Sequence, residues 1–455
     1  MGKLRGLWLL PAVLSAVLGL WGIDGPSFWA DEGGSVAIAR LPPPDLLAVL
    51  DHMDRVHAVY YGLLHLVISV VGTGEWAMRL PSVLAMSAAA GLLTALGRRL
   101  VSPAAGLLAG LIYALLPVVS RYAQEARQYA LVTALAIGAT YLLVVAVERR
   151  RARWWAAYAG VLTVVGWLHL YGLFLLPAHA LMLRSATAWR RWGIAAAVVC
   201  AASAPLVLLA VPQSGLISWL PLPSAATVRH LGTLVFGGHP VAIWTVLVLA
   251  ALGLRERAVR VVALPWLAAP LALMIAISFA VRPIFYPRYA LYCVAALALA
   301  AGAGLAALRP RPLAPVLVVA LAAVMVPAHL AIRAPSSRPD DLRGLAHTLR
   351  AHSLPGDAVL YVPAGNWMSV TPYLGSMAWL DTTTLHRDRF FGDLPPGRFR
   401  EVVAGEARVW VVERATGSHG NAVELRRDRR FRLVRSWTFR TRTLSVFEQV
   451  AVSKK

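Results

Sequence analysis

The strongest constraint on this chain is a series of long apolar segments separated by short basic stretches. Each segment is close to the roughly 20 residues that a helix needs to cross a bilayer. Of the 455 residues, 58% are hydrophobic and 15% are charged, whereas soluble domains are about half apolar and a quarter charged. The sequence therefore predicts a polytopic α-helical membrane protein.

The apolar segments predict about eleven membrane spans. We place these spans at 6–23, 80–97, 103–119, 128–147, 154–169, 170–184, 193–211, 239–254, 261–280, 289–307 and 313–332. A shorter apolar run at 59–72 is either a further span or a helix in the membrane surface. The first segment also resembles a signal peptide, but it lacks a clear cleavage site, so we expect it to be retained.

The net charge of +22 would suggest nucleic acid in a soluble protein, but the positions of the basic residues favour another explanation. They gather in every second connection, as the positive-inside rule requires of cytoplasmic loops, and no nucleic-acid motif is present. These basic connections contain Lys3 and Arg5, Arg98 and Arg99, 148–153, 184–191, 255–260 and 309–312. We therefore expect an extracytoplasmic location for 24–79, 120–127, 212–238, 281–288 and the tail from 333.

The composition changes near residue 333. The stretch "RPDDLRGLAHTLRAHSLPGDAVLYV" predicts an amphipathic helix, a Pro-Gly turn and a buried strand. The stretches "ARVWVVER" and "FRLVRSWTFRTRTLSVFEQV" have the alternation and β-branched content of strands. We predict two domains, a membrane domain at 1–332 and a small extracytoplasmic α/β domain at 333–455.

Two adjacent acids, Asp31 and Glu32, follow the first predicted span in "PSFWADEGG". Successive residues of a helix are about 100° apart, so the two carboxylates cannot easily reach one point. One acid would then face a reacting group, while the other contacts a metal, an arginine or the loop. A simpler explanation is a pair of solvated surface acids.

The same predicted loop continues with "DHMDRVHAVYYGLLHL", in which polar residues repeat at helical spacing. Asp54, His57, Tyr61 and His65 are three or four residues apart, so they would share one face of a helix. Such a helix could lie on the membrane with its polar face toward an aqueous cavity. The histidines could equally serve only as interfacial side chains, and a zinc site is weakly indicated because no matched ligand set is present.

Two further clusters fall at predicted outer ends of spans. In "SRYAQEARQYA", Arg121, Glu125 and Arg127 lie where a span begins, and charges are costly within a bilayer. A plain ion pair between Arg121 and Glu125 is the simpler explanation. In "RPIFYPRY", Arg282 and Arg288 could hold a phosphate group, because guanidinium matches phosphate oxygens in two parallel hydrogen bonds.

All of these clusters fall on one predicted face of the membrane. Carboxylates, histidines and arginines beside aromatic residues are suited to a polar, phosphorylated group on a lipid carrier. The sequence also resembles the polyprenyl-phosphate-sugar-dependent glycosyltransferases of the GT-C superfamily, especially the bacterial mannosyltransferase-like members of family 39. The resemblance covers roughly residues 1–310 and rests on "FWADEGGSVAIAR", "MDRVHAVYYGLLHLVISVVGTGEWAMRLPSVLA", "RRLVSPAAGLLAGLIYALLPVVSRYAQEARQYAL" and "RPIFYPRYAL". Many relatives have His-Pro-Pro where this chain has "HAVYY".

The resemblance implies an inverting sugar transfer with Asp31 as the catalytic base. Glu32 would orient the loop or bind a metal, and Glu125 would be a second catalytic acid. His57 and Tyr61 would line the sugar pocket, with Asp54 as a further substrate-binding residue. The lipid-phosphate leaving group would be stabilised by Arg121, Arg127, Arg282 and Arg288.

The resemblance also implies the partners and the location. The donor would be a sugar, with mannose-like favoured, on a polyprenyl phosphate, and the acceptor would be an envelope glycan, lipid or protein. No cofactor is implied with certainty, although a divalent metal with Glu32 and His57 as candidate ligands stays open. The protein would lie in the bacterial inner membrane, contacting membrane lipids and no nucleic acid, with its active site on the extracytoplasmic side.

Two other functions compete with sugar transfer. A transporter or flippase for lipid-linked sugars would place ionisable residues and broken helices near the bilayer midplane, often in two related halves. The predicted spans are nearly free of charge, and no internal repeat is evident. A non-catalytic envelope-assembly protein would instead use its C-terminal domain to bind a partner, and would tolerate loss of Asp31, Glu32 and Glu125 together.

Overall fold

The computed structural model describes residues 6, 9–374, 399, 403, 405–417 and 420–450. Lys3 and Arg5 of the first basic cluster lie outside this described part, as does much of the stretch 375–404. The chain forms two compact units. The helical unit comprises Met1–Ile23, Leu50–Leu63 and Arg79–Arg333, and the mixed unit comprises Asp24–Val49, Leu64–Met78 and Ala334–Lys455.

The helical unit is built almost entirely from apolar helices. Its helices are α1 (Leu9–Leu20), α6 (Pro103–Leu115), α7 (Pro117–Ala123), α8 (Tyr129–Arg149), α9 (Ala152–Leu168), α10 (Leu175–Leu181), α11 (Ala186–Ala210), α12 (Ala225–Phe236), α13 (Pro240–Gly253), α14 (Arg257–Ala280), α15 (Val294–Ala307) and α16 (Leu313–Arg333). Short 3₁₀ helices join them at η2 (Arg55–His57), η3 (Leu170–Phe174), η4 (Val211–Ile217) and η5 (Pro287–Cys293). Three helices have residues in both units: α3 (Pro43–His52), α4 (Ala58–Val71) and α5 (Glu75–Leu100).

The predicted membrane character is confirmed by the lengths of these helices. Six helices of the described chain are long and apolar enough to cross a membrane, or up to eight if each of two bent pairs counts as one span. Three of the roughly eleven predicted spans, 6–23, 154–169 and 170–184, instead fall on the shorter helices α1, α9 and η3–α10. The apolar sequence there continues through turns, and the extended backbone of His169 ends α9, so hydrophobicity alone overestimated helix length.

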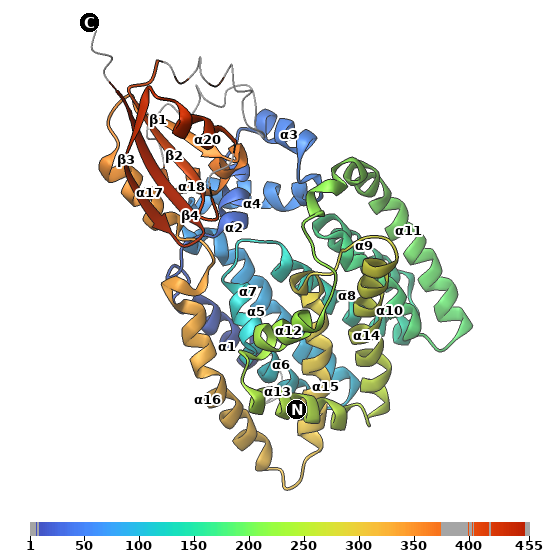
Figure 1. Cartoon of the computed structure of the whole chain (residues 1–455). Coiled ribbons are helices and arrows are strands. Elements are labelled where there is room, and N and C mark those ends of the chain that lie inside the picture. Colours follow the sequence, from blue (N-terminus) through green and yellow to red (C-terminus); the bar gives the residue numbers. More distant parts are fainter. Residues whose placement is uncertain are drawn as a thin grey trace, which may run out of the picture. The chain divides into compact units, whose positions relative to one another are not determined.

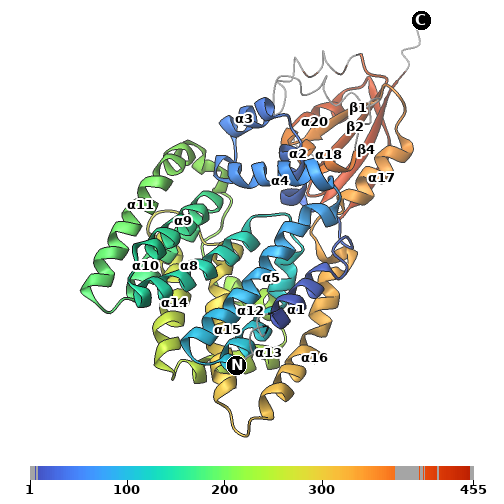
Figure 2. The same cartoon turned by 180° about the vertical axis from the view of Figure 1, so that it is seen from behind.

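Small residues allow close packing inside the helical unit. Helix α15 packs against both α13 and α6 (Figures 1 and 2). A side chain at Gly302 would collide with the backbone of Ala109 on α6, and one at Gly304 with the backbone of α13 at Leu249. The hydrophobic effect does not drive helices together in lipid, because lipid tails are as apolar as the side chains. Close approach of the backbones instead stabilises the packing through van der Waals contact.

The mixed unit contains a four-stranded sheet. Its strands are β1 (Ala358–Val362), β2 (Arg408–Arg414), β3 (Phe431–Phe439) and β4 (Arg442–Gln449), in the order β1-β2-β4-β3. Strand β1 is parallel to β2, with Ala358 opposite Val409, and the other pairs are antiparallel. All five residues of β1 are buried, as expected for an apolar strand covered on both faces.

Helices cover both faces of this sheet. The helices of the unit are α2 (Ala30–Ala39), α17 (Leu342–His352), α18 (Trp367–Leu374) and α20 (Gly420–Arg427). Leu345 of α17 and Val370 of α18 share a core with Val359 and Trp410, whereas Leu425 of α20 packs on the opposite face (Figure 1). The α/β character predicted for the C-terminal part is therefore confirmed.

Candidate active site

Asp31 and Glu32 lie in the first turn of α2. The helix dipole stabilises a carboxylate at a helix N-terminus by about 0.3–1 kcal/mol. Glu32 is fully buried at 0% exposure, whereas Asp31 is half-buried. The contrast follows from the angle of about 100° between successive helical residues. The simpler explanation of two solvated acids does not fit Glu32.

The start of α2 is held by residues more than 300 positions later in the chain. The Phe28 amide donates to the Tyr373 hydroxyl at 2.6 Å, and the Ala30 amide donates to Asp340 Oδ2 at 2.8 Å. Ala30 is the first residue of α2, where N–H groups have no partner within the helix, and Phe28 lies two residues before it. The C-terminal segment therefore supplies the capping groups for the acidic turn.

The same turn is also fixed by close packing. Helix α2 lies against α18 within the mixed unit. A side chain at Gly33 would collide with the backbone of Ser369 on α18, whereas Gly34 has no atom within 4 Å of such a position. The close contact between α2 and α18 therefore requires a glycine at position 33, directly after Glu32.

In the helical unit, the turn between α7 and α8 contains the third predicted cluster. This turn follows a 64° bend between α6 and α7. The buried amide of Gln124 donates to the carbonyls of Gly19, at 3.0 Å, and Trp21, at 2.7 Å, at the end of α1. These bonds satisfy two carbonyls that the end of a helix leaves open, and they fix the turn against the first helix.

Glu125 in this turn is almost completely buried, at 1% exposure. Its Oε2 accepts a hydrogen bond from Arg121 at 2.6 Å, so the ion pair suggested by the sequence is formed. Its Oε1 has no hydrogen-bond partner within the described part of the chain. A buried carboxylate oxygen without a partner is costly, and it is a natural position for a substrate hydroxyl or amide.

His57 contacts the next two polar residues of the turn. Its Nε2 lies 3.2 Å from Arg127 Nη2, and its Nδ1 lies 3.1 Å from the Gln128 side-chain amide. Because guanidinium can only donate, Nε2 must accept and Nδ1 carries the proton of the neutral ring. The structure places the amide nitrogen of Gln128 toward Nδ1, and exchanging the nitrogen and oxygen of this amide supplies the acceptor that the proton needs. Burial, then the charges of Arg127 and Arg288, hold the pKa of His57 well below its usual value.

The predicted single helical face for the second cluster is wrong in detail. Asp54 has a left-handed backbone, with φ of 56°, and His57 ends a 3₁₀ turn, so α4 begins only at Ala58. Asp54 nevertheless meets the helix, because the Tyr61 hydroxyl donates to its Oδ2 at 2.9 Å. His65 lies in the mixed unit, where Nδ1 is 2.8 Å from the Ala39 carbonyl.

The two arginines of "RPIFYPRY" have different surroundings. Arg282 donates to the carbonyl of Ser214 at 2.8 Å. Arg288 is 8% exposed, and its guanidinium lies 4.7 Å from the ring centre of Tyr286 and 5.7 Å from that of Tyr129. Stacking of this kind leaves the in-plane N–H groups of a guanidinium directed away from the ring faces.

An aromatic cluster that the sequence did not single out surrounds Arg288. The His169 ring lies 5.7 Å from Tyr129, 5.4 Å from Tyr171 and 5.2 Å from Tyr289. His169 Nε2 is buried without a hydrogen-bond partner in the described chain. The sequence signals for this cluster were Tyr289, which follows Arg288, and His169, which ends a predicted span. The two residues are 120 positions apart, so their contact could not be predicted.

Glu32 and His57, the residues suggested as metal ligands, belong to different units. Within the part of the chain that the structure describes, no group of three or more His, Cys, Asp or Glu side chains is arranged to hold an ion. Both ring nitrogens of His57 already face Arg127 and Gln128. His57 therefore has no lone pair to offer a cation while this arrangement holds.

Comparison with known proteins identifies the fold. Residues 58–215 match the family model described as dolichyl-phosphate-mannose-protein mannosyltransferase. The crystal structure of ArnT from Cupriavidus metallidurans in the apo state matches with a TM-score of 0.67 and 15% identity, covering 98% of each chain. The chain has the GT-C glycosyltransferase fold. The resemblance noted in the sequence is thus confirmed at the level of fold.

Other GT-C structures agree with this match. ArnT bound to undecaprenyl phosphate matches with a TM-score of 0.67 and 15% identity, covering 97% of this chain and 98% of that one. AglB, the archaeal oligosaccharyltransferase from Archaeoglobus fulgidus in complex with an inhibitory peptide and a dolichol phosphate, matches with a TM-score of 0.54 and 10% identity. The match covers 91% of this chain and 69% of AglB. No curated protein matches the sequence.

Proposed function

We propose that this GT-C protein is a glycosyltransferase that moves a sugar from a polyprenyl-phosphate carrier to an acceptor in the cell envelope. The observation that carries the proposal is the match along nearly the whole chain to ArnT bound to undecaprenyl phosphate. The family model at residues 58–215, named for a mannosyltransferase acting with dolichyl phosphate, supports the same donor class. A mannose-like sugar is favoured for that reason.

The proposed reaction is an inverting displacement with Asp31 as base. The Asp31 carboxylate takes the proton of the acceptor hydroxyl, whose oxygen forms a bond to the anomeric carbon. The bond from that carbon to the phosphate oxygen breaks, and its electron pair leaves with the polyprenyl phosphate. Glu32 would orient the acidic turn. The exposure of Asp31, greater than that of Glu32, supports giving Asp31 the role that contacts substrate.

The leaving phosphate needs positive charge, and the helical unit supplies it. We assign Arg127 and Arg288, with Arg121 and Arg282, to the stabilisation of this group, the electrostatic effect that usually contributes most to catalysis. The unpartnered Oε1 of Glu125 would orient the acceptor or the sugar. His57 and Tyr61, with Asp54, would line the sugar pocket, where the neutral ring of His57 fixes Arg127.

The location and domain organisation also belong to this proposal. The basic connections support an extracytoplasmic position for the acidic turn and the C-terminal part, and the membrane we propose is a bacterial inner membrane. The acceptor would then be an envelope glycan, lipid or protein. We keep the division into a membrane domain at 1–332 and an extracytoplasmic domain at 333–455 as part of the proposal.

The test compares wild type with Asp31→Asn, both purified and returned to lipid. Each is offered a panel of radiolabelled polyprenyl-phosphate sugars with an envelope extract as acceptor. We expect transfer by wild type to name the sugar, and a loss of about a hundredfold or more in Asp31→Asn, because a base typically contributes that much. Asp45→Asn, a change of the same kind at an exposed acid on α3, is the matched control and should retain activity.

Full activity of Asp31→Asn would reject Asp31 as the base. If wild type and variant both bind a donor and neither transfers its sugar, a transporter or flippase becomes the better explanation, and movement of labelled donor across vesicles would test it. If loss of Asp31, Glu32 and Glu125 together leaves envelope assembly intact, the protein acts without catalysis.

A further inference from the structure

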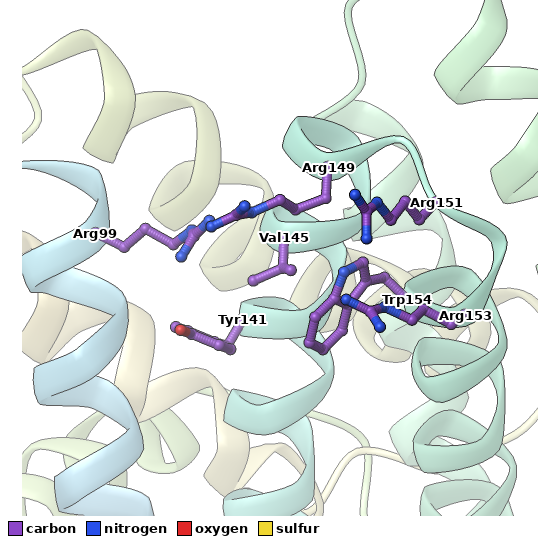
Figure 3. Close-up of a pocket in the computed structure, with 7 residues that line it drawn as sticks. All are labelled: Arg99, Tyr141, Val145, Arg149, Arg151, Arg153 and Trp154. Carbon is purple, nitrogen blue, oxygen red and sulfur yellow. The ribbon is translucent and has the colours of Figure 1, made fainter.

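A second cationic site lies at the other end of α8. Helix α8 begins at Tyr129, beside Arg288, and ends at Arg149. Its 21 residues span about 30 Å, which is the apolar thickness of a bilayer. The C-terminal end of α8 and the start of α9 border a cavity of about 330 Å³ lined by Arg99, Tyr141, Val145, Arg149, Arg151, Arg153 and Trp154 (Figure 3).

The local backbone explains why so many arginines share one cavity. Arg150 ends α8 with a left-handed φ of 53°, a conformation that a residue other than glycine rarely adopts. Its carbonyl accepts a hydrogen bond from Arg191, which fixes the reversal of the chain. Arg149 on one side of this residue and Arg151 and Arg153 on the other therefore line the same cavity.

Arg149, Arg151 and Arg153 are exposed, yet all three line the same cavity as Arg99. Figure 3 shows the side chains of Arg99 and Arg149 extending toward each other, and the guanidinium groups of Arg151 and Arg153 beside Trp154. Glu148 pairs with Arg99 at 2.5 Å but does not line the cavity. Glu148 balances the charge of Arg99, so Arg149, Arg151 and Arg153 give the cavity a net positive charge that favours an anion.

Trp154 supplies a second and independent indication. Its indole Nε1 is buried and has no hydrogen-bond partner within the described chain, although buried donors are normally paired. The indole lies in a cavity with Arg153 only 5.2 Å from its ring centre. An acceptor oxygen placed in the cavity would satisfy this N–H and the guanidinium groups together.

We propose that this cavity binds the phosphate group of a membrane lipid. Phosphate offers several oxygens, which arginine matches with pairs of parallel hydrogen bonds. Trp and Tyr side chains such as Trp154 and Tyr141 are typical of the headgroup level of a membrane. The site is separate from Arg288, which lies beside Tyr129 at the opposite end of α8, and the inference does not depend on the proposed sugar transfer.

The test measures lipid binding to the full-length protein in detergent by native mass spectrometry. Phosphatidic acid is the probe, phosphatidylcholine is the neutral comparison, and inorganic phosphate is the competitor. In the double variant Arg149→Gln/Arg153→Gln we expect about tenfold weaker binding of phosphatidic acid. Trp154→Phe removes the N–H together with part of the ring that lines the cavity, and it should weaken binding a few-fold. Arg255→Gln/Arg257→Gln, two exposed arginines of another connection, removes the same charge and should bind like wild type.

Equal weakening in both double variants would overturn the proposal, because it would show attraction to general surface charge. Unchanged binding in the cavity variant would overturn it as well. Displacement of the lipid by millimolar inorganic phosphate would support recognition of the phosphate group alone, whereas retention against phosphate would support recognition of that group within a lipid. Thermal unfolding of each variant checks that the fold is intact.

Discussion

At the scale of single residues, the charge state of His57 follows from its neighbours. Arg127 donates to Nε2, which requires an unprotonated ring nitrogen, and burial opposes a second proton on the ring. A neutral His57 keeps the Arg127 guanidinium fixed without adding positive charge beside it.

This charge state predicts a pH dependence of stability. The pKa of His57 is lowered in the folded protein, while an unfolded histidine titrates near 6.5. As the pH falls below about 6.5, the unfolded chain therefore gains a proton that the folded chain does not, and the free energy of unfolding decreases. In His57→Gln, which keeps an acceptor for Arg127, we expect a smaller decrease between pH 7.5 and 5, measured by thermal unfolding in detergent. Parallel curves for the two proteins would contradict a lowered pKa at His57.

The sequence identified the charged residues better than their contacts. Arg121 and Glu125 are four residues apart, so their ion pair could be predicted from helical spacing alone. The contact of His57 with Arg127 joins residues 70 positions apart, and no periodicity reports such a distance. The tyrosine neighbours of His169 come from three different segments of the chain, and no spacing in the sequence indicates such contacts.

At the scale of elements, two adjacent glycines of α2 differ in how closely other atoms approach them. Gly33 faces the backbone of Ser369, whereas Gly34 faces open space. Gly33→Ala should lower the stability by about 1–3 kcal/mol through overpacking, and it should reduce sugar transfer by moving the acidic turn. Gly34→Ala should raise the stability by about 0.5–1 kcal/mol, because alanine is the better helix former.

Thermal unfolding and the transfer assay check this pair of variants together. A similar melting temperature for the two would show that α2 does not pack on α18 as closely as described. The sequence predicted neither glycine's role. The contact depends on α18, more than 330 positions later, and on the amide partners Asp340 and Tyr373, which sequence analysis assigned only to a separate C-terminal domain.

At the scale of the whole molecule, hydrophobicity and charge carried most of the predictable information. Most of the apolar runs are about as long as a helix that crosses a bilayer. The composition therefore predicted the fold class. The number of spans did not, because a hydrophobic run does not show where a helix breaks. The bend of 64° after α6 occurs inside apolar sequence, next to Pro117.

The orientation of the protein in the membrane decides on which side of the membrane the proposed sugar transfer takes place. The positive-inside rule places α3 outside the cell and the connection before α14 in the cytoplasm. In a background of Cys200→Ser and Cys293→Ala, single cysteines are introduced by Asp45→Cys and Arg257→Cys, both at exposed positions. A membrane-impermeant maleimide should label the first variant in intact cells and the second only after the membrane is disrupted. The reverse pattern would place the acidic turn of α2 in the cytoplasm, where a donor exposed outside the membrane could not reach it.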